Sequence, residues 1–132
     1  MKNERAASGS RVVILGASNK EDRYSWKAFN FLLEGGYVPV PVHPRIEEVG
    51  GIPVFSSLND PKILEDGPID TVTLYVNPLV VEESVSAIIA LQPRRVIMNP
   101  GTESDAARSS LTNAGIVVVD ACTLVMLRTK QF

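Results

Sequence analysis

The sequence predicts an α/β fold in which helices cover both faces of a five-stranded, mostly parallel sheet. Five short runs rich in valine and isoleucine alternate along the chain with segments of helical periodicity, which is the pattern of parallel sheets. The runs show no apolar–polar alternation, so both faces of the sheet are expected to be buried. The predicted strands are 11–15, 37–42, 71–76, 95–98 and 115–119.

The helical segments have recognisable ends. The first should end at Gly35, because glycine commonly follows the last helical turn. The second should follow Asn77 as its N-cap, with Pro78 at the first helical position. The third opens with a Thr-x-x-Asp pattern that resembles a capping box. The four predicted helices are 25–34, 78–91, 102–114 and 122–130.

The pattern is weakest between the second and third strands. Residues 47–51 predict a loop, 52–55 a short extended piece, and 57–60 the start of a short helix. Pro39 and Pro41 remove hydrogen-bond donors from the second strand, so we expect that strand to be irregular or partly unpaired.

The glycine at the end of the first strand suggests an arrangement for the sheet. Numbering the five strands along the chain, we predict the order 3-2-1-4-5, because the first strand-to-helix turn carries the glycine signal. This order reverses the direction of winding between the first and fourth strands. Ligands of open α/β sheets bind at the carboxyl ends of the strands at such a point.

Size and charge limit the function classes. The chain has 132 residues, enough for one domain with one core. Its formal net charge of −2 leaves no basic footprint for nucleic acid. No run approaches the roughly 20 apolar residues of a membrane helix. The single cysteine excludes an internal disulfide and a cysteine-based zinc site.

The N-terminal residues 1–10 are polar and lack the apolar core of a secretory signal. We therefore expect a disordered or frayed tail over 1–10, one folded domain over 11–132, and a cytoplasmic location.

The loop after the first strand is the best candidate for a phosphate site. Gly16 allows a sharp turn, and Ala17 and Ser18 are small enough for a phosphate to approach the backbone. The helix that follows adds free N–H donors and a partial positive charge. An ordinary tight turn with solvated charges would carry similar residues, but the strand–turn–helix context favours the phosphate site. The polar side chains available there belong to Asn19, Lys20, Arg23 and Ser25.

The end of the second strand discriminates between cofactors. NAD-binding domains usually place Asp or Glu there to hold the ribose hydroxyls. This chain has His43, Pro44 and Arg45 instead, which suits a ribose that carries a phosphate, as in coenzyme A or NADP. A solvated loop is the alternative. His43 has no second His or Cys as a partner, so no metal site is expected.

Two further strand ends should face the same crevice, and both are rich in turn residues. Turn and capping chemistry explains these residues as well as ligand contact does. Cys122, beyond the fifth strand, is expected to be a buried packing residue, because no base is placed beside it. No catalytic constellation, Walker A motif or nucleophile elbow is present, so no catalytic residue is assigned. The candidate residues of the two strand ends are Asn77, Pro78, Pro100, Gly101 and Glu103.

The chain resembles the stand-alone CoA-binding domain proteins, which are similar to the N-terminal domain of the succinyl-CoA synthetase α subunit. The resemblance runs from about Arg11 to about Leu127, and its most specific piece is the Gly-x-Pro-Val-Phe segment followed by Ser-Leu. It implies a Rossmann-type three-layer α/β/α fold. The segments that carry it are 13–18, 36–44, 51–58 and 75–78, together with Cys122.

The resemblance also implies a site. Pro44 and Arg45 would lie near the ribose phosphate, and Asn77 and Pro78 near the adenine or pyrophosphate. The order of residues in Pro100-Gly101-Thr102-Glu103 differs from the Glu-Gly turn of the synthetase domain. The synthetase phosphohistidine belongs to a second domain, so ligase activity is not implied. The nucleotide loop itself would comprise Gly16, Ala17, Ser18, Asn19 and Arg23.

The sequence therefore predicts a non-catalytic module that binds coenzyme A or an acyl-CoA at the first strand-to-helix loop. The alternative is an NAD(P)-binding redox or sensor domain, or a thiol-active protein that uses Cys122. A third reading is a ligand-free domain that binds a protein. A protein partner or a homodimer is left open.

Overall fold

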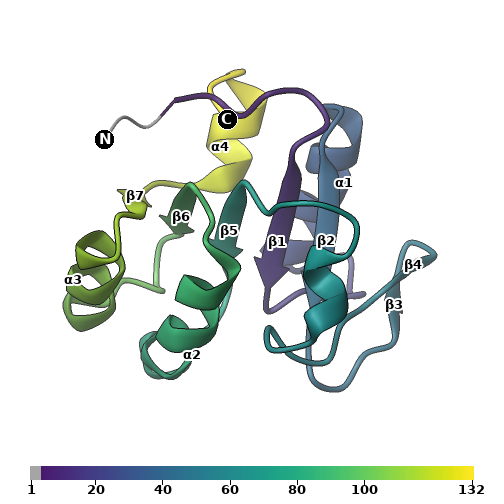
Figure 1. Cartoon of the computed structure of the whole chain (residues 1–132). Coiled ribbons are helices and arrows are strands. Elements are labelled where there is room, and N and C mark those ends of the chain that lie inside the picture. The colour runs from purple at the N-terminus through teal and green to yellow at the C-terminus, as the bar shows by residue number, and fades with distance from the viewer. Residues whose placement is uncertain (1–3) are drawn as a thin grey trace.

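Five parallel strands form the central layer of the computed structural model, which describes residues 4–132 (Figure 1). Their order across the sheet is β2-β1-β5-β6-β7, and every neighbouring pair is parallel. The predicted α/β class and the five parallel strands are confirmed. The strands are β1 (Arg11–Leu15), β2 (Val38–Val42), β5 (Thr71–Leu74), β6 (Arg95–Met98) and β7 (Val117–Asp120).

The strand order needs one correction. The third predicted strand, β5, pairs with β1 and not with β2, so the five strands are ordered 2-1-3-4-5 instead of 3-2-1-4-5. The outer side of β2 is reached only by Phe55, which forms an isolated parallel bridge with Val42. The winding of the sheet thus reverses between β1 and β5, one strand earlier than predicted.

Strand β2 is regular despite its two prolines. All five of its residues pair with β1, with Pro39 opposite Val12 and Pro41 opposite Ile14. The Pro41 carbonyl accepts the Phe55 N–H (N···O 3.0 Å) on the outer edge. Because the N–H and C=O of one strand residue point to the same side, the donors that Pro39 and Pro41 lack belong to that outer edge. The expected irregularity is absent, since the prolines cost this strand no bond to β1.

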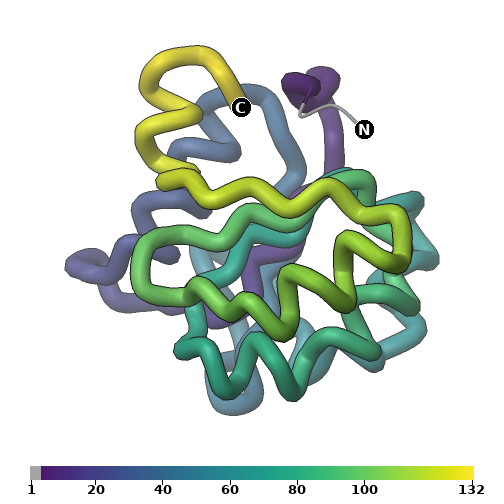
Figure 2. The backbone as a smooth tube through the Cα atoms, turned by 90° about the vertical axis from the view of Figure 1, so that its left-hand side faces the viewer, coloured from purple at the N-terminus to yellow at the C-terminus, as the bar shows by residue number. Residues whose placement is uncertain are grey.

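Helices cover both faces of the sheet, as predicted. Two apolar cores result, one on each face, because successive strand residues point to opposite sides. Val13 and Leu15 of β1 belong to one core, and Val12 and Ile14 to the other. Figure 2 shows α2 and α3 on one side of the strands and α1 and α4 on the other. The helices are α1 (Tyr24–Glu34), α2 (Pro78–Leu91), α3 (Asp105–Asn113) and α4 (Thr123–Arg128).

The weakly patterned region forms small elements. Strands β3 (Glu48–Val49) and β4 (Ile52–Pro53) make a two-stranded antiparallel hairpin, so the predicted loop over 47–51 contains a short strand. The short helix is a 3₁₀ turn, η1 (Pro61–Leu64), whose N-cap Asp60 accepts the Lys62 N–H at 2.9 Å. Within residues 4–132, no helix is long and apolar enough to cross a membrane.

The N-terminal segment differs from the expected frayed tail where it is described. Residues 1–3 of that tail lie outside the described residues. Ala6 is buried, and its N–H donates to the carbonyl of Phe132 at 2.9 Å. The Gly9 N–H donates to the Gly36 carbonyl at 2.9 Å. These bonds hold the segment against the C-terminus and the α1–β2 turn.

Asn99, directly after β6, joins three elements inside the protein. Its side chain is buried and donates to the Thr73 hydroxyl (2.7 Å) and the Leu74 carbonyl (2.8 Å) of β5. Its Oδ1 accepts the Thr123 N–H at the start of α4 (2.8 Å). Asn99 therefore fixes the carboxyl ends of β5 and β6 to α4.

Replacement of Asn99 by alanine should destabilise the protein. Asn99→Ala removes these three hydrogen bonds and leaves buried polar groups without a partner. The free energy of unfolding should therefore fall by about 2–3 kcal/mol. Urea unfolding followed by circular dichroism measures the change. Asn113→Ala, at an exposed position, is the control and should change it by less than about 0.5 kcal/mol. Equal effects of the two variants would contradict the structural role of Asn99.

Candidate functional site

A cleft of about 830 Å³ opens at the carboxyl ends of β2, β1 and β5. It lies at the point where the winding of the sheet reverses, the usual ligand position in open α/β sheets. The turn after β1 and the start of α1 form its floor, the loop after β2 forms one side, and β5 with the start of α2 forms the other. The lining segments are 15–20, 23–25, 42–46 and 75–76, together with Val80.

Gly16 holds the floor of the cleft in a conformation that other residues resist. Its φ is +90°, and a Cβ there would lie 2.6 Å from the Tyr75 carbonyl oxygen and 2.8 Å from Val76 Cγ1. The N–H groups of Gly16 and Ala17 both donate to the Val42 carbonyl, at 3.0 and 3.1 Å. The turn is thus packed between β2 and β5. These two N–H groups are occupied, so donors for a ligand must come from farther along the loop.

The N-terminus of α1 supplies such donors. Its N-cap is Arg23, which is extended (φ −83°, ψ 141°) and makes no side-chain capping bond. The N–H groups of the first helical residues, Tyr24 and Ser25, have no partner within the helix. The other long helices differ, since Asn77 caps α2 and Ser104 caps α3. The open end of α1 therefore faces the cleft with unsatisfied donors and the positive end of the helix dipole.

The charged side chains that line the cleft beside this helix end are cationic. Lys20, Arg23 and Arg45 line the cleft and are exposed, and they form no ion pair within residues 4–132. No Asp or Glu is among the described residues that line the cleft. Glu21 and Asp22 belong to the same loop but lie outside the lining. Cations and free N–H groups in one lining fit a ligand that carries several phosphates.

His43 shapes the loop after β2. Its Nδ1 accepts the Arg45 N–H at 3.0 Å, which closes a tight turn around Pro44. Burial, and then the neighbouring charge of Arg45, lower the pKa of His43 below its usual 6.5. The imidazole is therefore neutral at pH 7 and holds Arg45 in place, while Arg45 carries the positive charge. Among residues 4–132, no group of three or more His, Cys, Asp or Glu side chains could hold a metal ion.

The predicted site residues divide into two groups. Those of the first loop and the loop after β2 come together in the cleft: Gly16, Ala17, Ser18, Asn19, Lys20, Arg23, Ser25, His43, Pro44 and Arg45. Within this group, the Ser18 hydroxyl accepts the Lys20 N–H at 3.0 Å and so shapes the loop.

The residues of the two other strand ends do not line the cleft. Asn77 Oδ1 accepts the Val80 N–H at 3.0 Å as the cap of α2, and Pro78 is the first residue of that helix. Glu103 Oε1 accepts the Gly101 N–H at 2.8 Å, next to the exposed Pro100. Capping and turn chemistry accounts for these contacts.

An apolar wall completes the cleft, at a strand end that was expected to face the crevice through Asn77 and Pro78. Tyr75 and Val76, at the end of β5, lie beside Gly16 because β5 is the neighbour of β1. Val80 of α2 and Tyr24 of α1 extend this wall. Burial raises the pKa of Tyr75 to about 12, so its phenol is protonated at neutral pH. The signal in the sequence was the Tyr75-Val76 pair, but its position depends on the strand order.

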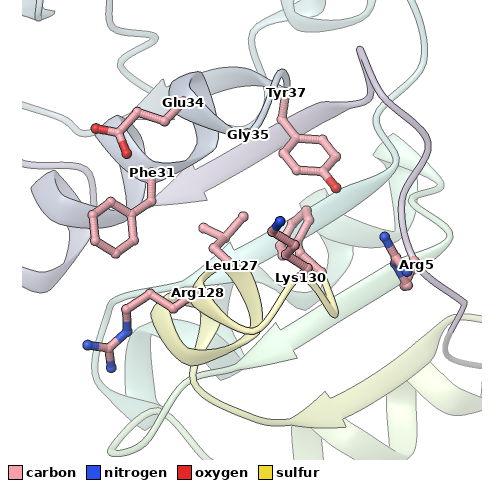
Figure 3. A pocket seen from close by; sticks show the side chains of 9 residues that line it. Arg5, Phe31, Glu34, Gly35, Tyr37, Leu127, Arg128 and Lys130 are labelled. Carbon is pink, nitrogen blue, oxygen red and sulfur yellow. The ribbon is translucent and has the colours of Figure 1, made fainter.

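A second, smaller cavity of about 420 Å³ lies at the other end of α1, where Figure 3 shows Tyr37 and Leu127 among its lining residues. Arg5, Arg128 and Lys130 stand around it. It contains none of the predicted site residues.

Comparison with known families shows which family the chain belongs to. Residues 10–128 match the model of the CoA binding domain family. The chain belongs to this family. The match covers both loops of the cleft and every helix and strand of the fold.

Members and relatives of known structure share the architecture of this CoA binding domain. A crystal structure of an uncharacterized protein is 35% identical, with a TM-score of 0.84, and covers 96% of this chain and 100% of its own. A Thermus thermophilus structure, cell-free ID.343, is 27% identical with a TM-score of 0.83, covering 94% of this chain and 91% of that one. A hypothetical protein from Pyrococcus horikoshii OT3 is 29% identical with a TM-score of 0.81, covering 89% and 81%.

A curated relative matches part of the CoA binding domain. The Bacillus subtilis (strain 168) protein YneT, described as uncharacterized, is 35% identical over 65 residues. The matched stretch is 49% of this chain and spans 45% of the length of YneT.

The contact between Gly16 and β5 can be tested against a matched glycine. Gly16→Ala and Gly115→Ala both place a side chain at positive φ, +90° and +85°, which costs about 1–2 kcal/mol. Only the Gly16 variant also meets the Tyr75 carbonyl, whereas a Cβ at Gly115 meets nothing within 4 Å. Urea unfolding should show that Gly16→Ala is less stable than Gly115→Ala by a further 1–3 kcal/mol or so. Equal stabilities would contradict the close approach.

Proposed function

We propose that this chain is a non-catalytic module that binds coenzyme A or an acyl-CoA in the cleft at the Gly16 turn. The observation that carries the proposal is the open N-terminus of α1 in one cleft with Lys20, Arg23 and Arg45, without a lining carboxylate. Coenzyme A carries a diphosphate and a ribose phosphate, and these negative charges match the three cations and the free N–H groups of the cleft. Membership of the CoA binding domain family supports the ligand class.

In this proposal, the diphosphate is held at the start of α1. The N–H groups of Tyr24 and Ser25 and the side chains of Ser18 and Asn19 act as donors, as anions at helix N-termini generally require. Lys20 adds a charge on the loop before the helix. Phosphates would also satisfy a helix end that the protein itself leaves uncapped.

The ribose phosphate is assigned to the loop after β2. Arg45 is exposed there, unpaired with any carboxylate of the described chain, and its backbone is held by His43. An NAD-type ribose would need an acidic partner at this strand end, and the lining has none. NADP shares the ribose phosphate with coenzyme A, so it is the competing ligand, and family membership favours coenzyme A.

The proposed role is to hold the ligand. Cys122, the candidate for thiol chemistry, is the N-cap of α4 and is not among the residues that line the cleft. The lining contains no acid–base pair of the kind that general catalysis uses, because its titratable groups are His43, Tyr24, Tyr75 and cations.

Replacement of Arg45 tests the assignment. Arg45→Ala should weaken binding of coenzyme A about fivefold, the effect of losing an exposed charge contact worth roughly 1 kcal/mol, and leave dephospho-coenzyme A unaffected. Isothermal titration calorimetry at constant ionic strength measures both affinities. Arg128→Ala, at the second cavity, is the control and should change neither.

Two outcomes of this titration would contradict the proposal. One is an equal loss of affinity for both ligands in Arg45→Ala, which would remove the ribose phosphate from that loop. The other is tighter binding of NADP⁺ than of coenzyme A by the unaltered protein, which would favour the dinucleotide alternative.

A further inference from the structure

The chemistry of the cleft changes from one side to the other. Arg45 and His43 stand at the end of β2, and the Gly16 turn and α1 lie over β1 in the middle. Tyr75 and Val76 stand at the end of β5. Neighbouring strands are about 4.8 Å apart, so the ends of β2 and β5 are separated by about 10 Å. Across this distance the lining passes from cationic, through hydrogen-bond donors, to apolar.

The apolar side continues out of the cleft onto the surface. Tyr24, which lines the cleft, is 69% exposed, and Leu79, next to the lining residue Val80, is 66% exposed. Single exposed apolar residues are ordinary on protein surfaces. Here, however, the two most exposed large apolar side chains of the described residues both stand at helix starts, and Tyr24 itself is one of the lining residues of the cleft.

The order of groups along an acyl-CoA matches this order across the sheet. The ribose phosphate comes first, then the diphosphate, then the pantetheine arm, and finally the thioester and its acyl chain. With phosphates at Arg45 and at the start of α1, the arm must continue toward β5 and α2. The reverse direction would place phosphates against Val76 and Val80, where the lining offers no charge to pair with them.

We infer that the apolar lining residues of the cleft, Tyr24, Val76 and Val80, bind the acyl chain of an acyl-CoA thioester, so that affinity rises with chain length. This inference rests on the proposed function and adds the class of ligand. The apolar residues would thus contact the aliphatic chain of the same ligand whose nucleotide binds at the cationic side of the cleft, over the neighbouring strands.

A chain-length series tests this inference. Coenzyme A and its acetyl, butyryl and hexanoyl thioesters are titrated calorimetrically into the whole protein. A fully buried methylene contributes about 0.8 kcal/mol, or about fourfold in affinity, and an open cleft buries about half of it. Affinity should therefore rise about twofold per methylene, on the order of tenfold from acetyl-CoA to hexanoyl-CoA.

Variants locate the effect. Tyr24→Ser should reduce the hexanoyl-to-acetyl affinity ratio to about threefold or less, since it removes apolar contact area from the lining. Leu64→Ser replaces a leucine that is 43% exposed on η1, away from the cleft, and should leave the ratio unchanged. Thermal unfolding checks that the variants are folded, as exposed substitutions normally are.

The remaining outcomes separate this inference from the proposed function. Binding of coenzyme A with no dependence on chain length overturns the inference and leaves the proposed function intact. No binding of coenzyme A at millimolar concentration overturns the proposed function itself. If Tyr24→Ser weakens adenosine 3′,5′-bisphosphate as much as hexanoyl-CoA, the base occupies the apolar side, and the inference is overturned.

Discussion

The close approach of the Gly16 turn to β5 is the contact on which the site depends. The Gly16 N–H is bonded to the Val42 carbonyl at the end of β2, while its Cα faces the Tyr75 carbonyl so closely that a Cβ would lie 2.6 Å away. Adjacent strands on either side thus hold the end of β1. Because the turn is fixed in this way, the loop that follows brings the start of α1 to the cleft, where Tyr24 and Ser25 belong to the lining.

The start of α1 lacks the stabilising side-chain cap that α2 and α3 have. A side-chain cap is worth about 1 kcal/mol, and α2 and α3 both have one, from Asn77 and Ser104. Arg23 at the same position of α1 gives up this contribution and adds positive charge to the positive end of the helix dipole. Departures from local stabilising rules tend to mark functional sites, and a bound phosphate would reverse the deficit.

Most of the fold could be predicted from local pattern. Buried runs such as 11–15 and 95–98 have no other stable environment than the middle of a parallel sheet, and Gly16 marks the turn between β1 and α1. The strand order could not be predicted, because it depends on a long-range choice of which strand pairs with β1. The strand end 75–78 was expected at the crevice through Asn77 and Pro78, whereas the residues that line the cleft there are Tyr75 and Val76.

The division of the predicted site residues has a similar cause. Asn77 and Glu103 belong to residue types that serve equally as helix caps, turn acceptors and ligand contacts, so only coordinates distinguish these roles. The cationic residues of the first loop are more distinctive as candidates, since nothing within a short tight turn requires Lys20 or Arg23. Charge without a structural partner is the part of a binding site that a sequence shows most clearly.

The most direct test of the central claim is a titration with coenzyme A followed through the backbone amide signals of the ¹⁵N-labelled protein by nuclear magnetic resonance. The largest shift changes should occur at Ser18, Asn19, Tyr24 and Ser25, at the start of α1, and should saturate together. Changes centred on Tyr37 and Lys130 at the second cavity, or no changes at millimolar coenzyme A, would contradict it.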